Sequence, residues 1–229
     1  MRIAKYFSQQ KIASRREAEE YLKKGQVTVN GEVVKDMGRQ IDPDKDVVEI
    51  IGKMVSKTTI AYFKPRGISS STIEEEGTNV FDVLPQYESL NTVGRLDKQS
   101  EGLILLTDDG VLASIITSDK HIIEKEYRVT VREIINPKQL LFLEKGVFLE
   151  DGLTLPVSIE IIDEHTFTIV MKEGRKHQIR RMANAVNLTI ENLTRTRIGP
   201  ITLDKLKEGS YRTLKLDEVQ RLIDTAPIP

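Results

Sequence analysis

A carboxylate lies in a glycine-bracketed loop near the middle of the 229-residue chain. Asp97 closes the stretch Gly94-Arg95-Leu96-Asp97, and an apolar run, Leu103 to Thr107, follows a second glycine at Gly102. Glycine permits backbone shapes that other residues resist, and a buried strand can hold a loop carboxylate as rigidly as a catalytic site requires. Such a carboxylate could serve as a nucleophile. Position alone favours a structural ion pair with the neighbouring Arg95 over a nucleophile.

The composition excludes several other chemistries. The chain has no cysteine, which rules out disulfides, thiolate zinc sites and thiol nucleophiles, including the one that methylation of uridine C5 requires. Its three histidines, His121, His165 and His177, lack metal-ligand spacing, so we interpret them as surface or structural residues and predict no metal site. The glycine-rich loops that bind nucleotide cofactors are also missing from the sequence.

The net charge of −1 conceals two basic segments. Residues 1–16 contain five basic residues and no acidic one, and residues 172–197 contain seven basic residues against Glu173 and Glu191. Two such segments could form one surface that faces phosphates. Charge alone leaves open that both are ordinary solvated faces.

The first fifty residues predict a small unit of two short helices and a sheet. Ser14 followed by Glu17 forms a capping box, and Gly25 ends the second helix. Asn30-Gly31 between two valine-rich segments predicts a tight hairpin. A further strand is expected at residues 47–51, followed by a linker at residues 52–57.

Strand and helix signals alternate irregularly beyond the linker. We predict strands at residues 59–63, 103–107, 126–131, 157–162 and 166–171, a turn at 108–110, and helices at 137–145, 177–186 and 216–223. Because the strands outnumber the helices and do not alternate with them regularly, we expect an α+β fold with a mostly antiparallel mixed sheet flanked by helices. The expected domains are residues 1–52 and 58–229.

The sequence shows no sign of membrane association. No apolar run approaches the roughly 18 residues needed to span a bilayer, and the first ten residues lack the apolar core of a signal peptide. We therefore expect a cytoplasmic protein with no membrane partner.

The N-terminal unit resembles the alpha-L (S4-like) RNA-binding fold. The resemblance covers about residues 1–51 and is carried by Ile12-Ala13-Ser14-Arg15-Arg16-Glu17-Ala18 and Gly25-Gln26-Val27-Thr28-Val29-Asn30-Gly31. It implies that a basic helical face contacts RNA phosphates, here through Lys5, Arg15, Arg16, Lys23 and Lys24. A charged mini-domain that binds a protein is the alternative.

Four motifs in the rest of the chain resemble, in order, those of the pseudouridine synthases that carry an alpha-L module and modify ribosomal RNA. They are Phe63-Lys64-Pro65-Arg66-Gly67-Ile68, the segment from Gly94 to Gly110, Glu124-Lys125-Glu126-Tyr127, and Glu173-Gly174-Arg175-Lys176-His177-Gln178-Ile179-Arg180-Arg181-Met182. The resemblance implies an intramolecular transferase, an isomerase that converts uridine to pseudouridine, with a catalytic domain at residues 58–229.

The resemblance also implies a role for each matching residue. Asp97 corresponds to the catalytic aspartate, Tyr127 to the residue that stacks on the target base, and Arg180 to the partner of that aspartate. Arg95 would fill the gap left by the extruded uridine, because a guanidinium can stack on bases and bind phosphates. Ile179 and Leu103 would form apolar walls, and Arg175, Lys176 and Arg181 would bind RNA. Without the resemblance, Tyr127 would be interpreted as a core aromatic and Arg180 as a phosphate contact.

The implied reaction needs no cofactor. The carboxylate either adds covalently or assists an elimination, and Asp97 serves both routes. The implied partner is RNA, most simply ribosomal RNA or a ribosome assembly intermediate, and we expect a monomer. Two alternatives are a non-catalytic RNA-binding or ribosome-assembly protein and a different RNA enzyme, such as a methyltransferase or nuclease. The sequence leaves open which ribosomal subunit, and which uridine, is the target, and whether transfer RNA is also modified.

Overall fold

The computed structural model describes residues 1–52, 56–70, 77–118 and 122–225. His121 and part of the expected linker lie outside these ranges. Among the described residues, no helix is both long and apolar enough to cross a membrane.

The N-terminal residues form two helices and a three-stranded sheet with their own core. Helices α1 (Ile3–Gln9) and α2 (Arg15–Lys23) precede strands β1 (Val27–Val29), β2 (Glu32–Val33) and β3 (Val48–Ile50), in the sheet order β2-β1-β3. The predicted capping box is present, since the Ser14 hydroxyl accepts from the Glu17 amide and the Glu17 carboxylate accepts from the Ser14 amide. Asn30 and Gly31 both have positive φ, as a tight hairpin turn requires.

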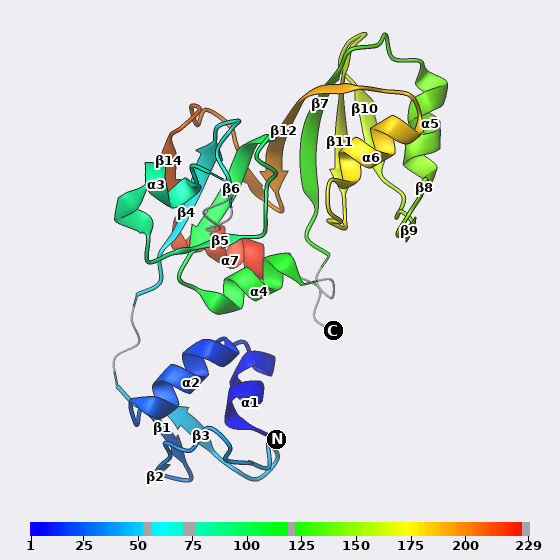
Figure 1. The fold of residues 1–229 in the computed structure, drawn as a ribbon. Coiled ribbons are helices and arrows are strands. Elements are labelled where there is room, and N and C mark those ends of the chain that lie inside the picture. The colour runs from blue at the N-terminus through cyan, green and yellow to red at the C-terminus, as the bar shows by residue number, and fades with distance from the viewer. Residues whose placement is uncertain (53–55, 71–76, 119–121, 226–229) are drawn as a thin grey trace.

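The remaining residues build a nine-stranded mixed sheet (Figure 1). Seven strands follow the order β10-β11-β7-β12-β6-β4-β14, with β13 paired to β12 and β5 to β6. The bounds are β4 Thr59–Lys64, β5 Asn91–Val93, β6 Glu101–Thr107, β7 Lys125–Val131, β10 Ser158–Ile161, β11 Thr166–Met171, β12 Ile190–Ile198, β13 Ile201–Thr202 and β14 Tyr211–Thr213. The strand pairs of this sheet are antiparallel except β12 with β6, which confirms the predicted α+β class with a mixed sheet.

Helices cover the sheet, and a small hairpin lies beside it. The bounds are α3 Val80–Val83, a 3₁₀ turn η2 Pro85–Tyr87, α4 Gly110–Thr117, α5 Pro137–Lys145, α6 Gln178–Ala185, α7 Leu216–Asp224, and the hairpin strands β8 Phe148–Leu149 and β9 Gly152–Leu153. Helix α5 has the predicted bounds. The expected turn at residues 108–110 leads directly into α4, a helix that was not predicted from the sequence. The Asp109 carboxylate caps this helix by accepting from two amides.

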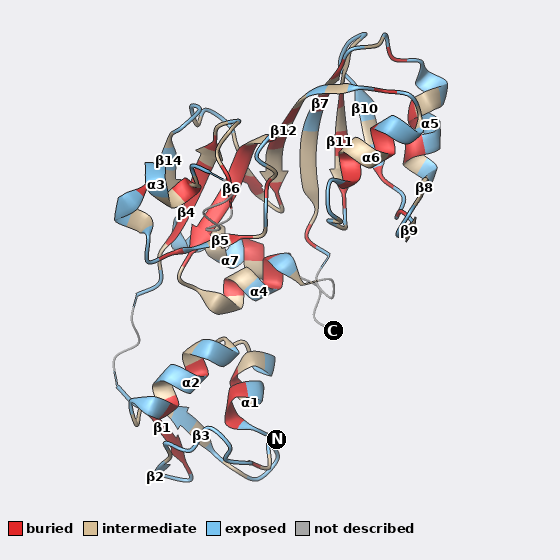
Figure 2. Ribbon diagram, in the orientation of Figure 1, coloured by how far each residue is buried: buried red, intermediate tan, exposed pale blue. Residues whose placement is uncertain are grey.

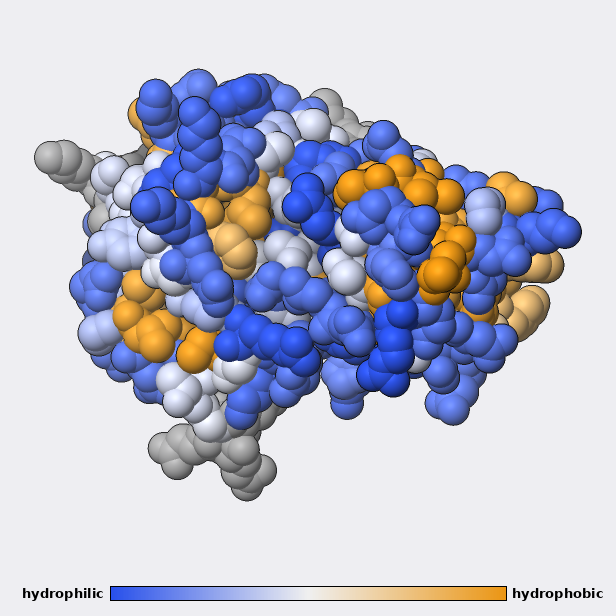
Figure 3. Space-filling model, turned by 90° about the horizontal axis from the view of Figure 1, so that it is seen from above, coloured by the Kyte–Doolittle hydropathy of each residue, from blue (hydrophilic) through white to orange (hydrophobic). Residues whose placement is uncertain are grey.

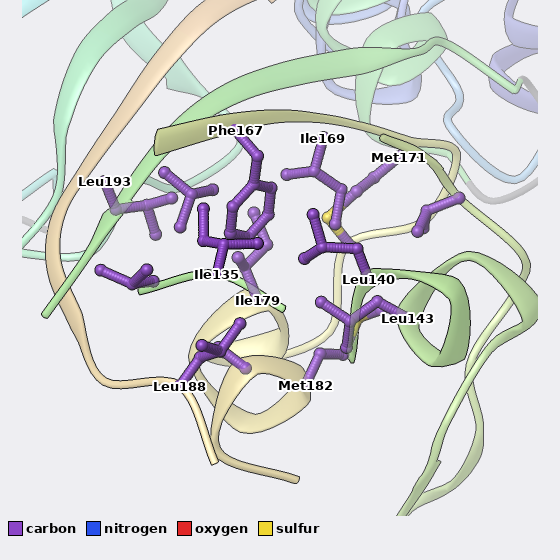
Figure 4. Close-up of a cluster of buried hydrophobic side chains, with 14 residues drawn as sticks. Ile135, Leu140, Leu143, Phe167, Ile169, Met171, Ile179, Met182, Leu188 and Leu193 are labelled. Atoms are coloured by element: carbon purple, nitrogen blue, oxygen red, sulfur yellow. The ribbon is translucent and has the colours of Figure 1, made fainter. Parts of the chain in front are cut away.

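Separate apolar clusters hold the helices to the sheet, and Figure 2 shows the burial along β6 and on the inner faces of the helices. One cluster packs α4 and α7 against β6 and contains Leu103, Leu105 and Leu222. Another packs α5 and α6 against β7, β11 and β12, with Phe167, Ile179 and Met182 among its members (Figure 4). The second cluster fixes α6, which supplies the cationic side of the site described below.

Some hydrophobic side chains remain on the surface. Ile134, Phe142 and Ile162 are exposed, and they belong to the half of the molecule that carries α5 and β10. Figure 3 shows hydrophobic surface on this half in the view from above, and further hydrophobic patches on the other half.

Candidate active site

Asp97 lies in the loop between β5 and β6, and this loop is fixed along its whole backbone. The carbonyls of six consecutive residues, 95 to 100, each accept a hydrogen bond. In chain order the donors are the Arg195 guanidinium, the Ser70 hydroxyl, the Ser100 amide, the Gly67 amide, the Arg180 guanidinium and the Lys64 ammonium. A backbone held at every carbonyl has little freedom left, so the loop presents the Asp97 carboxylate in one place, as a catalytic group requires.

Ser70 and Lys64 anchor the two ends of this loop. The Ser70 hydroxyl accepts from the Leu96 amide at 3.1 Å and donates to the Leu96 carbonyl at 3.0 Å. Lys64 is fully buried, and its Nζ donates to the carbonyls of Pro65, Ile68 and Ser100 at 2.7–2.8 Å. Burial, and secondarily the nearby Arg195 charge, lower the pKa of Lys64 to about 8. A neutral amine has only two N–H groups, so deprotonation would leave one of the three carbonyls without its donor.

Lys64 gives a prediction for stability against pH. The unfolded lysine has a pKa near 10.5. Between about pH 8 and 10.5 the unfolded chain therefore binds more protons than the folded one, and the Lys64 contribution to the free energy of unfolding rises with pH. We expect the stability of the wild type relative to Lys64→Met to increase across this window in urea unfolding. Lys207→Met, which removes an exposed ammonium, should run parallel to the wild type. Parallel curves for the wild type and Lys64→Met would contradict this.

The side chain that approaches the Asp97 carboxylate is that of His177, not that of Arg180. His177 Nε2 lies 3.5 Å from Asp97 Oδ1. The expected direct pair with Arg180 is not formed: Arg180 Nη2 donates to the Gln99 carbonyl at 2.9 Å and to the Ser100 hydroxyl at 3.4 Å. Burial lowers the pKa of Arg180, while attraction to the Asp97 charge works in the opposite direction. Arg180 therefore anchors the backbone of the loop and acts on the carboxylate only through space.

His177 owes its place to an unusual backbone conformation. It adopts φ +52 immediately before α6, so the chain turns there and directs the imidazole to Asp97. The Gln178 side chain closes this turn, because its Oε1 accepts from the Arg175 amide and its Nε2 donates to Glu173. From the sequence, His177 was interpreted as a surface or structural histidine. Its place within the fourth motif was the one available signal for a role in the site.

Two of the expected RNA-binding arginines are engaged within the chain. Arg181 makes a bidentate pair with Asp151 at 2.8 and 2.9 Å, and this pair lowers the pKa of Asp151 to about 2. Arg175 donates to the carbonyls of Asp151, Gly152 and Leu153. Both arginines therefore tie the β8–β9 hairpin to α6 and the segment before it. Lys176 is exposed.

A cavity of about 870 Å³ opens above Asp97. We call it the Asp97 cavity. Five of the six residues expected to act on the target nucleoside line it: Asp97, Arg95, Tyr127, Arg180 and Ile179. Arg175, Lys176, His177 and Arg195 also contribute to its wall. Residues far apart in sequence thus meet around one carboxylate.

Leu103, the sixth of these residues, does not line the Asp97 cavity. Its side chain is fully buried in the cluster below α4 and α7, and only its carbonyl takes part, by accepting from Arg195 Nε at 2.6 Å. The expectation of an apolar wall at Leu103 was wrong because neighbouring side chains of a strand point to opposite faces. Ile104 points to the other face, where it packs in a separate cluster with Leu96 and Tyr62.

The expected N-terminal RNA-binding residues lie at the surface. Lys5, Arg15, Arg16, Lys23 and Lys24 are all exposed on or next to α1 and α2. Lys23 also pairs with Glu20 at 2.7 Å. Their exposure is compatible with contact to phosphates.

Three residues of the site besides His177 were not predicted from the sequence. Lys64 belongs to the first motif, Ser70 follows that motif, and Arg195 lies in β12. A lysine at the end of an apolar strand was a signal for Lys64. Nothing in the sequence distinguished Arg195 from the other cations of the basic segment.

Comparisons with known proteins show which families the chain is similar to. The model of the RNA pseudouridylate synthase family matches residues 58–185, and that of the S4 domain matches residues 1–48. The chain is 36% identical to the ribosomal large subunit pseudouridine synthase B of Bacillus subtilis, over 96% of this chain and 95% of that protein. It is 31% identical to the ribosomal small subunit pseudouridine synthase A of Haemophilus influenzae, over 97% and 100%. A crystal structure of a pseudouridylate synthase superposes with a TM-score of 0.72 at 31% identity, covering 97% of this chain and 99% of the other.

Proposed function

The chain belongs to the RNA pseudouridylate synthase family, and we propose that it converts one specific uridine of ribosomal RNA to pseudouridine, without a cofactor and with Asp97 as the catalytic residue. The observation that carries the proposal is the loop of residues 95–100. Every one of its carbonyls is hydrogen-bonded, and it places one carboxylate at a cavity shared with Tyr127.

The residues around the cavity have complementary tasks in this proposal. The target base must leave its stack, which costs a few kcal/mol, and Tyr127 receives it by stacking. Arg95, in the loop next to Asp97, occupies the space the nucleotide vacates. The ammonium of Lys64 and the guanidinium of Arg180 attract the Asp97 charge. Asp97 then attacks the nucleoside covalently or assists an elimination, after which the base turns and C5 is joined to the ribose.

RNA binding is divided between two regions in this proposal. Residues 1–52 form the RNA-binding domain and residues 58–229 the catalytic domain. The exposed cations of α1 and α2 contact phosphates, and Lys176 extends that contact to the rim of the cavity. Arg175 and Arg181 contribute by shaping the rim, because their donors are directed to the β8–β9 hairpin.

The names of two relatives support a proposal for the class of target RNA. One relative is named for the large ribosomal subunit and another for the small one. We infer that this chain acts on ribosomal RNA, as a monomer in the cytoplasm, on free RNA or on an assembly intermediate.

Mapping of pseudouridines in a strain that lacks the gene tests the function. We expect carbodiimide-based sequencing to show the loss of one pseudouridine in ribosomal RNA, restored by the wild-type gene. The position of the lost signal identifies both the subunit and the nucleotide. An unchanged pattern in ribosomal RNA would sink the proposal and favour a non-catalytic role in ribosome assembly, whereas a loss confined to transfer RNA would move the activity to that substrate.

A further inference from the structure

One residue that lines the Asp97 cavity has a buried side-chain nitrogen without a hydrogen-bond partner. It is Nη2 of Arg195, and no other buried side-chain nitrogen or oxygen of the described residues is unpaired. Arg195 is 2% exposed and contributes to the cavity wall. A buried donor without an acceptor costs free energy, so an unpaired guanidinium nitrogen in a native site calls for an explanation.

The rest of the guanidinium is held in place. Arg195 Nε donates to the Leu103 carbonyl at 2.6 Å, and Nη1 donates to the Arg95 carbonyl at 3.3 Å. These two bonds join strand β6 to the loop that carries Asp97. Because a guanidinium is planar and rigid, they also fix the direction in which Nη2 presents its two N–H groups.

The sheet places Arg195 between the aromatic residue and the catalytic loop. In β12 it is in register with Tyr127 of β7 on one side and with Gly102 of β6 on the other. At Gly102 the two backbones come so close that a Cβ would lie 2.4 Å from the Arg195 carbonyl oxygen. Arg195 therefore lies between β7, which carries Tyr127, and β6, which follows the loop of Asp97.

The charge of Arg195 is not neutralised by an ion pair. Within the described part of the chain it makes no salt bridge, and its charge is close enough to Lys64 to contribute to the lowered pKa of that lysine. A buried cation with an unused donor favours an acceptor on which negative charge develops. A phosphate stays near solvent in a groove, whereas this donor lies inside the molecule beside the proposed stacking residue.

We propose that Nη2 of Arg195 donates a hydrogen bond to a carbonyl oxygen, O2 or O4, of the target uracil. This inference rests on the proposed function. When the bond between C1′ and N1 breaks, its electron pair stays on the base, which becomes a uracil anion with charge on both carbonyl oxygens. The hydrogen bond to Arg195 then strengthens. C5 next forms the new bond to C1′, the C5 proton leaves, and N1 gains a proton, so the isomerisation is balanced.

The test compares oxygen with sulfur at the two carbonyls. The probe is a synthetic RNA that contains the mapped target with uridine, 2-thiouridine or 4-thiouridine at that position, because a thiocarbonyl accepts hydrogen bonds poorly. We expect Arg195→Lys to lower the single-turnover rate on uridine by about 10- to 100-fold, the factor of a charged hydrogen bond. One of the two thio substitutions should slow the wild type and leave Arg195→Lys unaffected.

A second variant separates substrate contact from support of the loop. Ser70→Ala removes a hydroxyl that holds the same loop at Leu96 but leaves the guanidinium in place. It should keep the full wild-type sensitivity to the thio substitution. If Arg195→Lys keeps that sensitivity too, Arg195 is only a support and the inference fails.

Two further measurements cover the remaining outcomes. A methylphosphonate beside the target should slow the wild type and Arg195→Lys by the same factor. Loss of its effect in the variant alone would assign Nη2 to a phosphate and overturn the proposal.

If Arg195→Lys does not fold, infrared spectra of ¹³C-carbonyl uracil in RNA bound to Asp97→Asn should show one carbonyl band moved to lower frequency. An unmoved pair of bands would refute the contact. If the wild type converts none of these RNAs, the proposed function fails rather than this inference.

Discussion

Asp97→Asn should abolish pseudouridine formation while the protein stays folded and still binds RNA. The substitution keeps the shape of the side chain and removes the charge and the nucleophilic oxygen. We expect turnover to fall by at least about four orders of magnitude, the scale seen when a group that acts on the reacting atoms is removed. The measurement is tritium release from C5-labelled uridine in ribosomal RNA, with RNA affinity determined in parallel.

Folding and binding should survive this change because the Asp97 side chain contributes little to the structure. It is 35% exposed, and its contact with His177 Nε2 is long, at 3.5 Å. The loop is held through its backbone carbonyls rather than through this carboxylate. Removing a negative charge also does not weaken contact with a polyanion.

Asp163→Asn is the matched control. Asp163 is an exposed aspartate in the turn between β10 and β11, where it accepts from the His165 amide. This variant should release tritium at the wild-type rate. Near wild-type release by Asp97→Asn would remove Asp97 from the chemistry, and equal losses in the two variants would point to a general effect of losing an acidic residue.

Gly102→Ala should destabilise the protein and remove most of its activity. Gly102 has φ +107, a conformation that L-residues rarely adopt, and a Cβ there would lie 2.4 Å from the Arg195 carbonyl oxygen and 2.7 Å from its amide nitrogen. Backbone strain of this kind costs about 1–3 kcal/mol, and forcing the strands apart adds a similar amount. We expect a total loss of about 2–6 kcal/mol in urea unfolding.

The expected loss of activity follows from the position of this contact. The parallel pairing of β6 with β12 sets the place of Arg195, which in turn holds the Arg95 carbonyl two residues before Asp97. Separating the strands therefore displaces the loop. Tritium release should fall under conditions in which Gly102→Ala is still folded.

Gly152→Ala controls for strain without the close approach. Gly152 has φ +105, nearly the same as Gly102, but no atom lies within 4 Å of the position its Cβ would take. It should lose only the strain energy and retain activity. If the two alanine variants lose equal stability, the close approach of β6 to β12 has no energetic weight.

Local patterns in the sequence were sufficient for the N-terminal unit and for several elements of the catalytic part. The Ser14–Glu17 capping box, the Asn30-Gly31 hairpin and the strand at residues 166–171 depend on neighbouring residues, and all are present. Helix α5 also has its predicted bounds, since Asn136 and Pro137 fix its start. Such signals need no tertiary contact, which is why they could be interpreted correctly.

Strand β12 was missed although it lies at the centre of the sheet. Its sequence, Ile190 to Ile198, is rich in threonine and arginine, and a register irregularity between Arg195 and Arg197 breaks the alternation of buried and exposed residues. Its buried position 195 is occupied by an arginine, whereas a hydrophobic pattern predicts apolar residues at buried positions. Strands β5 and β14 are only three residues long and left no periodic signal.

The sequence by itself determined the family resemblance, the α+β class and the identity of Asp97 as the candidate carboxylate, because ordered motifs and local signals are written in consecutive residues. Only the tertiary structure decided what surrounds that carboxylate. It put His177 where Arg180 was expected, turned Leu103 into the core, and brought Lys64, Arg180 and Arg195 to the backbone of one loop. These contacts join residues up to a hundred positions apart, and only the pairing of strands and the packing of helices fixes such distances.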